Sequence, residues 1–124
     1  MTTAHPFLMF QGQCAQALDF YAATLPEAAV LARQDKPDGT IAMARLQVAG
    51  LEIMLNDLPP VHDFDFTPSS SIFITLDTPD AVDPLAKAEA SGGKFLMPPG
   101  DYGFSPRFAW VQDRFGVSWQ ISAA

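Results

Sequence analysis

Along this chain, apolar and polar residues alternate in short runs, and one longer run repeats its apolar residues with a helical period. In the first half, the helical run has spacings of 4, 3 and 4 and ends at Pro26. Its apolar positions are Cys14, Leu18, Tyr21 and Leu25. The predicted strands of this half are Pro6 to Phe10, Ala28 to Gln34, Ile41 to Val48 and Leu51 to Leu55. The first half therefore predicts the order β-α-β-β-β.

The second half predicts the same order. Thr78-Pro79 is typical of a helix N-cap followed by a proline in the first turn, and Pro84 should bend this helix or delay its start. Ser91-Gly92-Gly93 then ends the helix. The predicted strands are Ser71 to Leu76, Lys94 to Met97, Arg107 to Gln112 and Val117 to Ile121.

The two halves also match in detail. Gly50 to Leu55 lies over Gly116 to Ile121 at an offset of 66 residues, and the same offset places His5 on Ser71. One offset that serves both ends of the halves indicates an internal duplication. We predict a first module over residues 1–57, a proline-containing connector over 58–69 and a second module over 70–124, together one compact domain.

The predicted strands have one apolar side and one mixed side. The apolar side should pack beneath the helices. The opposite side combines aromatic, aliphatic and polar residues, which indicates the lining of a cup that binds a ligand. An ordinary half-exposed sheet face is the alternative. The members of the mixed side are His5, Phe7, Met9, Glu52, Met54, Asn56, Ser71, Phe73, Thr75, Ser118 and Gln120.

Composition and charge narrow the partners. Hydrophobic residues make up 48% of the chain, and 14 acidic against 7 basic residues give a net charge of −7. This balance disfavours nucleic acid and anionic membranes and favours neutral or cationic small molecules, unless the charge serves only solubility. We expect a cytoplasmic protein, because the N-terminus lacks a signal-peptide pattern, no membrane-spanning run is present and Cys14 has no disulfide partner.

Two stretches resemble a known family. Pro6-Phe7-Leu8-Met9-Phe10-Gln11-Gly12, continuing to Asp19-Phe20-Tyr21, resembles the opening of PhnB-like proteins, and Trp110 to Ile121, which contains Asp113-Arg114-Phe115-Gly116, resembles their close. This branch belongs to the vicinal-oxygen-chelate (glyoxalase/bleomycin resistance/dioxygenase) superfamily. The resemblance implies an α+β fold of two βαβββ modules that form a curled mixed sheet around a cup, with the helices outside. It also implies a homodimer.

Members of this branch often carry the label of a 3-demethylubiquinone-9 3-methyltransferase, and we expect no such activity here. A methyltransferase of the common doubly wound type needs a glycine-rich turn after its first strand. The first strand here is followed by Gln11-Gly12-Gln13, and the chain is short for that fold.

The resemblance also implies where a metal would bind. Superfamily members that use a metal hold it with His and Glu side chains, and the matching positions here are His5 or Pro6, Met54, Ser71 and Gln120. Only His5 is a strong ligand for a hard or borderline cation, so we predict no family-type metal and no cofactor. A loop site of His62 with Asp57, Asp63 and Asp65 is the alternative to a solvated acidic loop.

Our first hypothesis is a metal-free dimer that binds a small neutral or cationic molecule in the cup. Contact area would come from Phe7, Met9, Met54, Phe73 and Trp110, and orienting hydrogen bonds from Asn56, Ser71, Thr75 and Gln120. The second hypothesis is a lyase, isomerase or dioxygenase with His5 and Glu52 as acid and base. An interaction module is the third.

Three other segments have two interpretations each. Cys14 is either a core residue or a thiol activated by the helix N-terminus. The segment from Pro98 to Pro106 is either a loop that closes over a ligand or a simple strand connection. Arg107 either binds an anionic group or pairs with Asp113 or Asp101.

Overall fold

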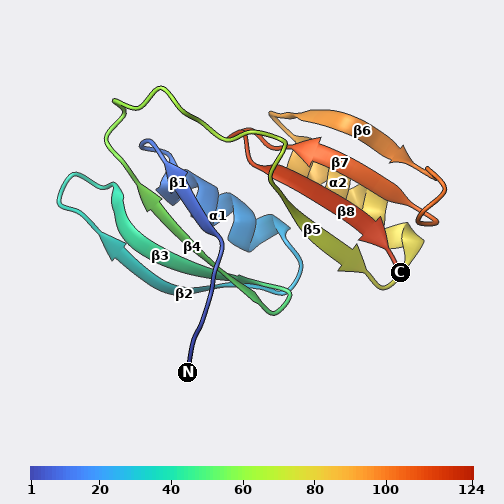
Figure 1. The fold of residues 1–124 in the computed structure, drawn as a ribbon, viewed down its shortest axis with the longest axis horizontal. Helices are drawn as coiled ribbons and strands as arrows, with labels where there is room; N and C mark the ends of the chain where they lie inside the picture. The colour runs from blue at the N-terminus through green and yellow to red at the C-terminus, as the bar shows by residue number, and fades with distance from the viewer. The chain divides into compact units, whose positions relative to one another are not determined.

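The computed structural model describes all 124 residues, which divide into two compact units, Met1–Asp63 and Phe64–Ala124 (Figure 1). We call them the N-terminal and C-terminal units. The first contains β1 (Phe7–Phe10), α1 (Cys14–Thr24), β2 (Ala28–Asp35), β3 (Ile41–Val48) and β4 (Leu51–Asp57). The second contains β5 (Ser71–Leu76), the 3₁₀ turn η1 (Pro79–Ala81), α2 (Val82–Ala90), β6 (Lys94–Gly100), β7 (Phe108–Gln112) and β8 (Ser118–Ala123).

Each unit is built on one four-stranded mixed sheet. The strand order is β1-β4-β3-β2 in the N-terminal unit and β5-β8-β7-β6 in the C-terminal unit. In both, the first strand pairs in parallel with the last, and the remaining pairs are antiparallel. The predicted α+β fold of two βαβββ modules is confirmed. The strands of each module pair only with one another, so each module has its own sheet. None of the helices combines the length and apolar character needed to span a bilayer.

The two sheets have the same register. Phe7 pairs with Met54 in one, and Phe73 pairs with Gln120 in the other, so both partners are displaced by the offset of 66 found in the sequence. In the neighbouring strand of each sheet, Arg45 of β3 lies opposite Met54, and Trp110 of β7 lies opposite Gln120. Arg45 and Trp110 are 65 residues apart in the sequence, and not 66, because the turn from β7 to β8 is one residue longer than the turn from β3 to β4.

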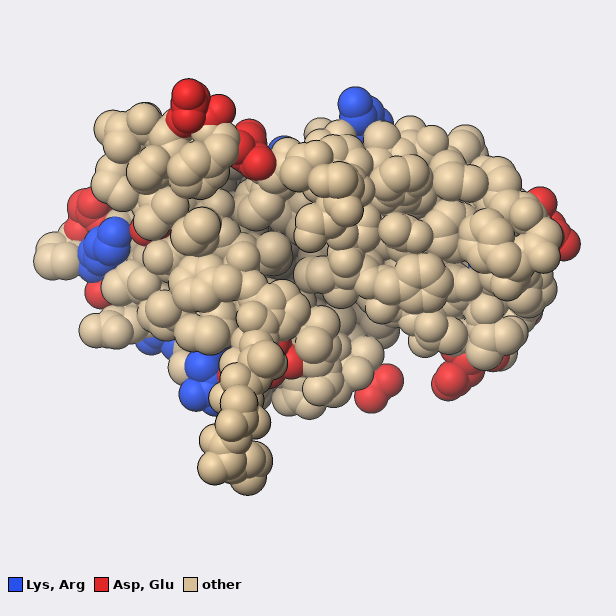
Figure 2. All heavy atoms as spheres, in the orientation of Figure 1, with Lys and Arg blue, Asp and Glu red and all other residues tan.

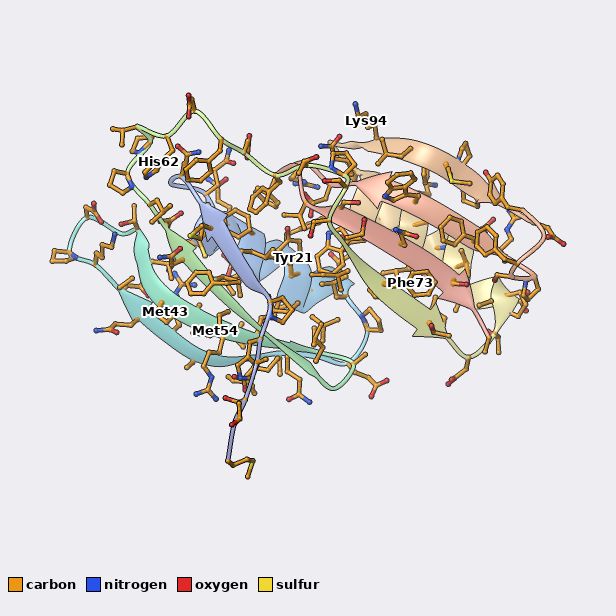
Figure 3. All side chains as sticks on the ribbon, viewed as in Figure 1. Tyr21, Met43, Met54, His62, Phe73 and Lys94 are labelled. Carbon is orange, nitrogen blue, oxygen red and sulfur yellow. The ribbon has the colours of Figure 1, made fainter.

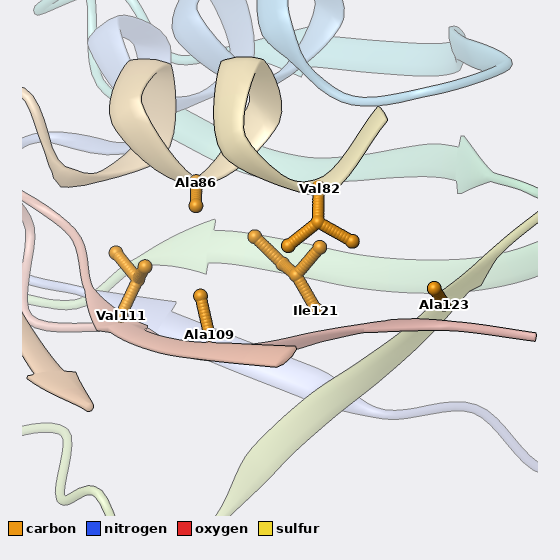
Figure 4. Close-up of a cluster of buried hydrophobic side chains, with 6 residues drawn as sticks. All are labelled: Val82, Ala86, Ala109, Val111, Ile121 and Ala123. Carbon is orange, nitrogen blue, oxygen red and sulfur yellow. The ribbon is translucent and has the colours of Figure 1, made fainter. Parts of the chain in front are cut away.

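One face of each sheet packs against the helix of its own unit. In the C-terminal unit, Val82 and Ala86 of α2 lie over apolar residues of β7 and β8 (Figure 4). The residues beneath them are Ala109, Val111, Ile121 and Ala123. In the N-terminal unit, the helical spacing seen in the sequence places Cys14, Leu18 and Tyr21 in the core, all fully buried. The apolar side of the strands therefore packs as the sequence pattern predicted.

The second helix differs in detail from its prediction. Helix α2 begins at Val82, after one turn of 3₁₀ helix, so Pro84 lies in the first turn, where the missing N–H is not needed. The predicted capping role of Thr78 is wrong, since its side chain makes no capping hydrogen bond. Strand β6 runs on through Pro98 and Pro99, which an edge strand tolerates because its outer N–H groups are not required for pairing.

Two buried carboxylates hold the turns of the sheets. In the N-terminal unit, Asp57 at the end of β4 accepts the backbone N–H groups of Gly12 at 2.8 Å, Cys14 at 3.0 Å and Ile41 at 2.9 Å. These bonds attach the start of α1 and the start of β3 to the same strand end. Gln13 makes no side-chain cap, so Asp57 performs that task for α1.

Asp113 holds the turn from β7 to β8 in the C-terminal unit. Its carboxylate accepts the N–H groups of Phe115 at 2.9 Å and Val117 at 3.0 Å, and the indole N–H of Trp119 at 2.8 Å. A single buried side chain thus fixes both the turn and the orientation of the largest core residue.

Cys14 is a core residue. Burial raises the pKa of its thiol to about 12, and the neighbouring Asp57 carboxylate acts in the same direction, while Arg33 opposes it. The thiol is therefore protonated at neutral pH, and the interpretation as an activated nucleophile is not supported by its surroundings.

We predict that replacing Asp57 by Ala costs about 3–5 kcal/mol of unfolding free energy, because three N–H groups lose a charged acceptor. Urea denaturation followed by circular dichroism measures this. Asp57→Asn, which keeps one acceptor oxygen, should lose less. The exposed Asp35, which pairs with Arg33, supplies the control Asp35→Ala with little change expected. Equal losses in Asp57→Ala and Asp35→Ala would contradict the anchoring role of Asp57.

A second prediction concerns the thiol. At pH 8 a thiol with this pKa is ~0.01% ionised, so Cys14 should not react with a disulfide reagent such as DTNB in the folded protein. Reaction should become complete in denaturant. Rapid labelling of the native protein, at a rate that does not change with denaturant, would contradict this assignment.

Candidate functional site

The side of each sheet opposite its helix is only partly covered, and we call it the open face of that unit. In the C-terminal unit, α2 lies behind β7 and β8 in Figure 1, so the viewer looks at the open face. The same orientation in Figure 2 shows few charged atoms over this sheet. All the side chains predicted to bind a ligand lie on one open face or the other, as their register requires.

On the N-terminal open face, Phe7, Met54 and Arg45 form one row across β1, β4 and β3. Met9 and Asn56 form the next row, and Phe7 and Met9 are both exposed. Met43 of β3 lies beside this surface, near Met54 (Figure 3). The Oδ1 atom of Asn56 is shielded from water and has no hydrogen-bond partner. This face is therefore mostly apolar, with the charged Arg45 at one end of a row and one unsatisfied acceptor on Asn56.

His5 and Glu52, the predicted acid and base, do lie together. Nδ1 of His5 is 3.2 Å from the backbone oxygen of Glu52, and because that oxygen can only accept, Nδ1 carries the hydrogen. Nε2 then faces the Glu52 carboxylate at 3.7 Å. Arg45 Nε is 3.2 Å from the same carboxylate oxygen.

The surroundings of this cluster limit its chemistry. The side chains of His5 and Glu52 are 28% and 27% exposed, and Glu52 is already paired with a guanidinium. The pair is thus not an isolated, desolvated acid and base of the kind that acid–base catalysis favours.

On the C-terminal open face, three polar side chains form a directed chain of hydrogen bonds. The Trp110 indole donates to the Ser118 hydroxyl at 2.7 Å, and the Ser118 and Ser71 hydroxyl oxygens are 2.6 Å apart. Ser71 donates onward to the Pro68 carbonyl at 3.4 Å, so Ser118 is the donor to Ser71. Trp110 and Ser71 therefore link β7 and β5 to β8 through Ser118, a role that the sequence did not reveal.

Four aromatic rings gather at the other end of this face, and we call them the ring cluster: Phe73, Tyr102, Phe104 and Phe108. The centroids of Phe104 and Phe108 are 4.8 Å apart with the rings nearly perpendicular. Phe73 of β5, labelled in Figure 3, is 55% exposed, and Phe104 is 62% exposed. Rings of this size are costly to leave in water, so this exposed cluster is the candidate binding surface of the C-terminal unit.

The loop that carries two of these rings is fixed by hydrogen bonds. The Tyr102 hydroxyl donates to the Pro98 carbonyl at 2.5 Å, and the Ser105 hydroxyl lies 2.9 Å from the Arg107 carbonyl oxygen and 3.0 Å from that of Ala123. The aromatic pair of the segment 98–106 was visible in the sequence. The part played by Phe108 follows from its strand parity but was not included among the predicted site residues.

Two polar groups next to the ring cluster make no side-chain hydrogen bond. Gln120 lies between Phe73 and Trp110 in one row, and Thr75 lies in the next row beside Ser122. Both point to the open face. They are the groups on this face that are available to orient a ligand.

The positions implied for a metal do not fit one. His5 and Met54 lie on the N-terminal open face and Ser71 and Gln120 on the C-terminal one, and together they offer one imidazole and no carboxylate. No group of three or more His, Cys, Asp and Glu side chains converges anywhere in the chain. In the alternative loop site around His62, the Asp57 carboxylate already accepts three backbone N–H groups.

Arg107 pairs with neither predicted partner. Its guanidinium makes a two-pronged bond with Asp83 of α2, with distances of 2.8 and 2.6 Å. Asp113 is buried and bonded to its own turn, and Asp101 accepts the N–H of Gly103. The Arg107 pair borders a shallow hollow of about 490 Å³ with Pro79 and Pro84, away from the open face.

Comparison with known proteins identifies the family. The family model described as 3-demethylubiquinone-9 3-methyltransferase matches residues 2–122. Protein YjdN of Escherichia coli K12 is 27% identical, with 94% of this chain and 92% of that protein covered. A solved structure described as a putative 3-demethylubiquinone-9 3-methyltransferase, PhnB protein, from Bacillus cereus is 32% identical, with a TM-score of 0.92 over 99% of this chain and 100% of that one.

A more distant structure shows the wider fold. A glyoxalase/bleomycin resistance protein/dioxygenase from Nocardioides has a TM-score of 0.61 at 20% identity, covering 99% of this chain and 84% of that one. Together with the paired βαβββ units, these findings confirm the resemblance seen in the sequence. The chain belongs to the 3-demethylubiquinone-9 3-methyltransferase family, is similar to a PhnB protein and has the fold of the glyoxalase/bleomycin resistance protein/dioxygenase structure.

Proposed function

We propose that this protein binds a small, planar, neutral or cationic molecule without a family-type metal. The observation that carries the proposal is the C-terminal open face, where exposed rings adjoin two polar side chains that have no partner. Apolar surface with a few well-placed polar groups is the usual composition of a small-molecule site.

The ring cluster provides the contact area. Phe73 and Phe104 expose ring surface, while Phe108 beneath them is buried and fixes their spacing. Stacking of one further ring contributes about 0.5–1.5 kcal/mol, and a cation over a ring face about as much. The net charge of −7 acts against anionic ligands and in favour of cationic ones.

The polar groups provide orientation. Gln120 offers both a donor and an acceptor, and Thr75 a hydroxyl, at adjacent rows of the same sheet. Ser71 and Trp110, the other predicted ligand contacts on this face, also support its surface through their bonds with Ser118. On the N-terminal open face, Phe7, Met9 and Met54 offer further apolar surface, whereas the unpaired Oδ1 of Asn56 is shielded and would accept a ligand N–H only if the side chains around it moved.

A methyltransferase activity finds no support in the residues. Each sheet is mixed and four-stranded, and β1 leads into α1 through Gln11-Gly12-Gln13, without a glycine-rich phosphate-type turn. We also propose that the protein acts as a homodimer in the cytoplasm. The edge strand β2 supports the homodimer, because this strand is exposed along its length and carries the apolar Val30 and Leu31.

The contact between His5 and Glu52 favours one alternative, an enzyme of the lyase, isomerase or dioxygenase type. In that case Nε2 of His5 would exchange a proton with the substrate, and Glu52 would stabilise the charged ring. Turnover of a ligand that is abolished in His5→Ala, while its binding persists, would replace the binding function with this one.

We predict that nickel, zinc, iron and manganese leave the melting temperature unchanged, because the donor set offers one strong ligand. Metal content after chelation and reloading, with thermal melts of the wild type and His5→Ala, tests this. Stoichiometric retention of one metal that His5→Ala abolishes would overturn the metal-free proposal.

A further prediction concerns binding. Proflavine, a planar aromatic cation, should quench tryptophan fluorescence with saturable affinity, and Phe104→Ala should weaken it about tenfold through lost stacking. The control is Phe95→Ala, an exposed phenylalanine of the same unit that pairs with Val111 on the helix side of the sheet. Saturable binding that is equally strong in both variants would place the site elsewhere, and no binding of proflavine or of neutral planar analogues would contradict the proposal.

A further inference from the structure

Helix α2 carries a carboxylic acid at a core position. Val82, Ala86 and Glu89 follow one another at spacings of 4 and 3, the same spacings as Cys14, Leu18 and Tyr21 of α1. Glu89 thus occupies the same position in this spacing on α2 that the buried Tyr21 occupies on α1. Its side chain is 0% exposed, and neither carboxyl oxygen has a hydrogen-bond partner.

An ionised carboxylate is not stable in such a place. Burial raises the pKa of Glu89 to about 8, the Asp113 carboxylate acts in the same direction, and Arg114 opposes both. Because this pKa lies above that of an exposed glutamate, the folded state gains from the proton. That contribution is complete below about pH 4.5 and is lost as the pH rises through about 8.

The charged groups around Glu89 come from few elements. Strands β7 and β8, on which α2 packs, contain no titratable side chain, and β6 contributes only the exposed Lys94. The 3₁₀ turn contributes the exposed Asp80, and α2 itself the exposed Lys87 and Asp83. The β7–β8 turn contributes Asp113 and Arg114. Asp113 is therefore the buried charge that Glu89 would meet on ionisation.

The end of the helix next to Glu89 is closed by two backbone hydrogen bonds, from Ser91 N–H to the Ala88 carbonyl at 3.3 Å and from Gly93 N–H to the Ala90 carbonyl at 2.8 Å. Arg114 donates to the carbonyl oxygen of Ser91 at 3.2 Å, just beyond the last residue of α2. Gly92 follows with a φ of +78°, and Gly93 packs against the backbone of Gln112 and Asp113 so closely that no Cβ fits. An ionised Glu89 reaches water most directly by unwinding this last turn.

We propose that Glu89 is a proton-operated latch on the last turn of α2. Protonated, it remains beneath the helix and the turn stays closed. Ionised, it moves out to solvent, and the segment from Ala88 to Gly93 opens together with the start of β6. Because β6 leads into the loop of the ring cluster, opening also loosens that loop, a consequence that rests on the proposed binding function.

Hydrogen exchange of the whole protein, followed by mass spectrometry between pH 5.5 and 7.5, tests the latch. Protection factors correct for the intrinsic pH dependence of exchange. In the wild type, peptides that cover Ala88 to Phe95 should lose about 100-fold in protection over these two pH units, since opening is linked to the release of one proton. Peptides of α1 in the N-terminal unit should not change.

Two variants make the test specific. Glu89→Gln, which imitates the protonated acid, and Glu89→Met, which fills the space without polarity, should both remove the pH dependence. Glu27→Gln removes the same charge at an exposed position of the other unit and should retain it. The latch is overturned if protection near α2 does not depend on pH, if both Glu89 variants retain the dependence, or if all of the C-terminal unit loses protection equally. Failure of proflavine and its neutral planar analogues to bind the wild type would contradict the binding proposal and leave these exchange outcomes untouched, so the two proposals can fail separately.

Discussion

The parallel pairing of the first strand with the last is the constraint from which the rest of each unit follows. It brings together residues that lie almost fifty positions apart in the chain, such as Phe7 and Met54 or Phe73 and Gln120. The helix between them must cross one face of the sheet, so that face becomes core and the other stays open. A slip of one residue would exchange the two faces. Asp57 opposes such a slip in the N-terminal unit, because it attaches the end of β4 to the segment after β1.

Much of this could be predicted, since it depends on periodicity. The alternation of apolar residues identified the helix-facing side of β1, β4, β5 and β8, and the single offset of 66 anticipated that Phe7 and Phe73 occupy equivalent rows. The helical spacing placed Cys14, Leu18 and Tyr21 in the core. These features can be predicted because burial of one face places apolar residues at fixed intervals along the chain.

What could not be predicted depends on which side chains meet across strands. The bonds from Trp110 to Ser118 and from Ser118 to Ser71 join three strands, and no local pattern announces them. Arg107 had acidic residues nearer in the sequence than Asp83, yet Asp101 and Asp113 accept N–H groups of their own loops, and Asp83 on the facing helix accepts both N–H groups of Arg107. Glu89 was not among the predicted core or site residues, because a glutamate is expected on the solvent side of a helix. Its burial is a departure from pattern of the kind that accompanies function or regulation.

The two open faces show how one backbone supports different chemistry. The row of Phe7, Met54 and Arg45 has the same register as the row of Phe73, Gln120 and Trp110. Its first member is a phenylalanine in both, whereas the others change from a thioether and a cation to an amide and an indole. Arg45 is engaged with Glu52, so the polar groups of the N-terminal face largely satisfy one another. In the C-terminal unit Ser118 accepts the indole N–H, and the amide of Gln120 makes no side-chain hydrogen bond.

The same reasoning bears on the metal chemistry of the superfamily. From composition alone, Ser71 is only a weak ligand. In the structure it is also an engaged one, since its oxygen lies 2.6 Å from Ser118 and its hydrogen is directed to Pro68. To coordinate a cation, Ser71 would have to leave this chain of hydrogen bonds, and the buried Ser118 hydroxyl would lose its acceptor. Replacing one neutral ligand by histidine would thus not be enough to create a metal centre, because Ser71 would still be engaged by Ser118 and Pro68.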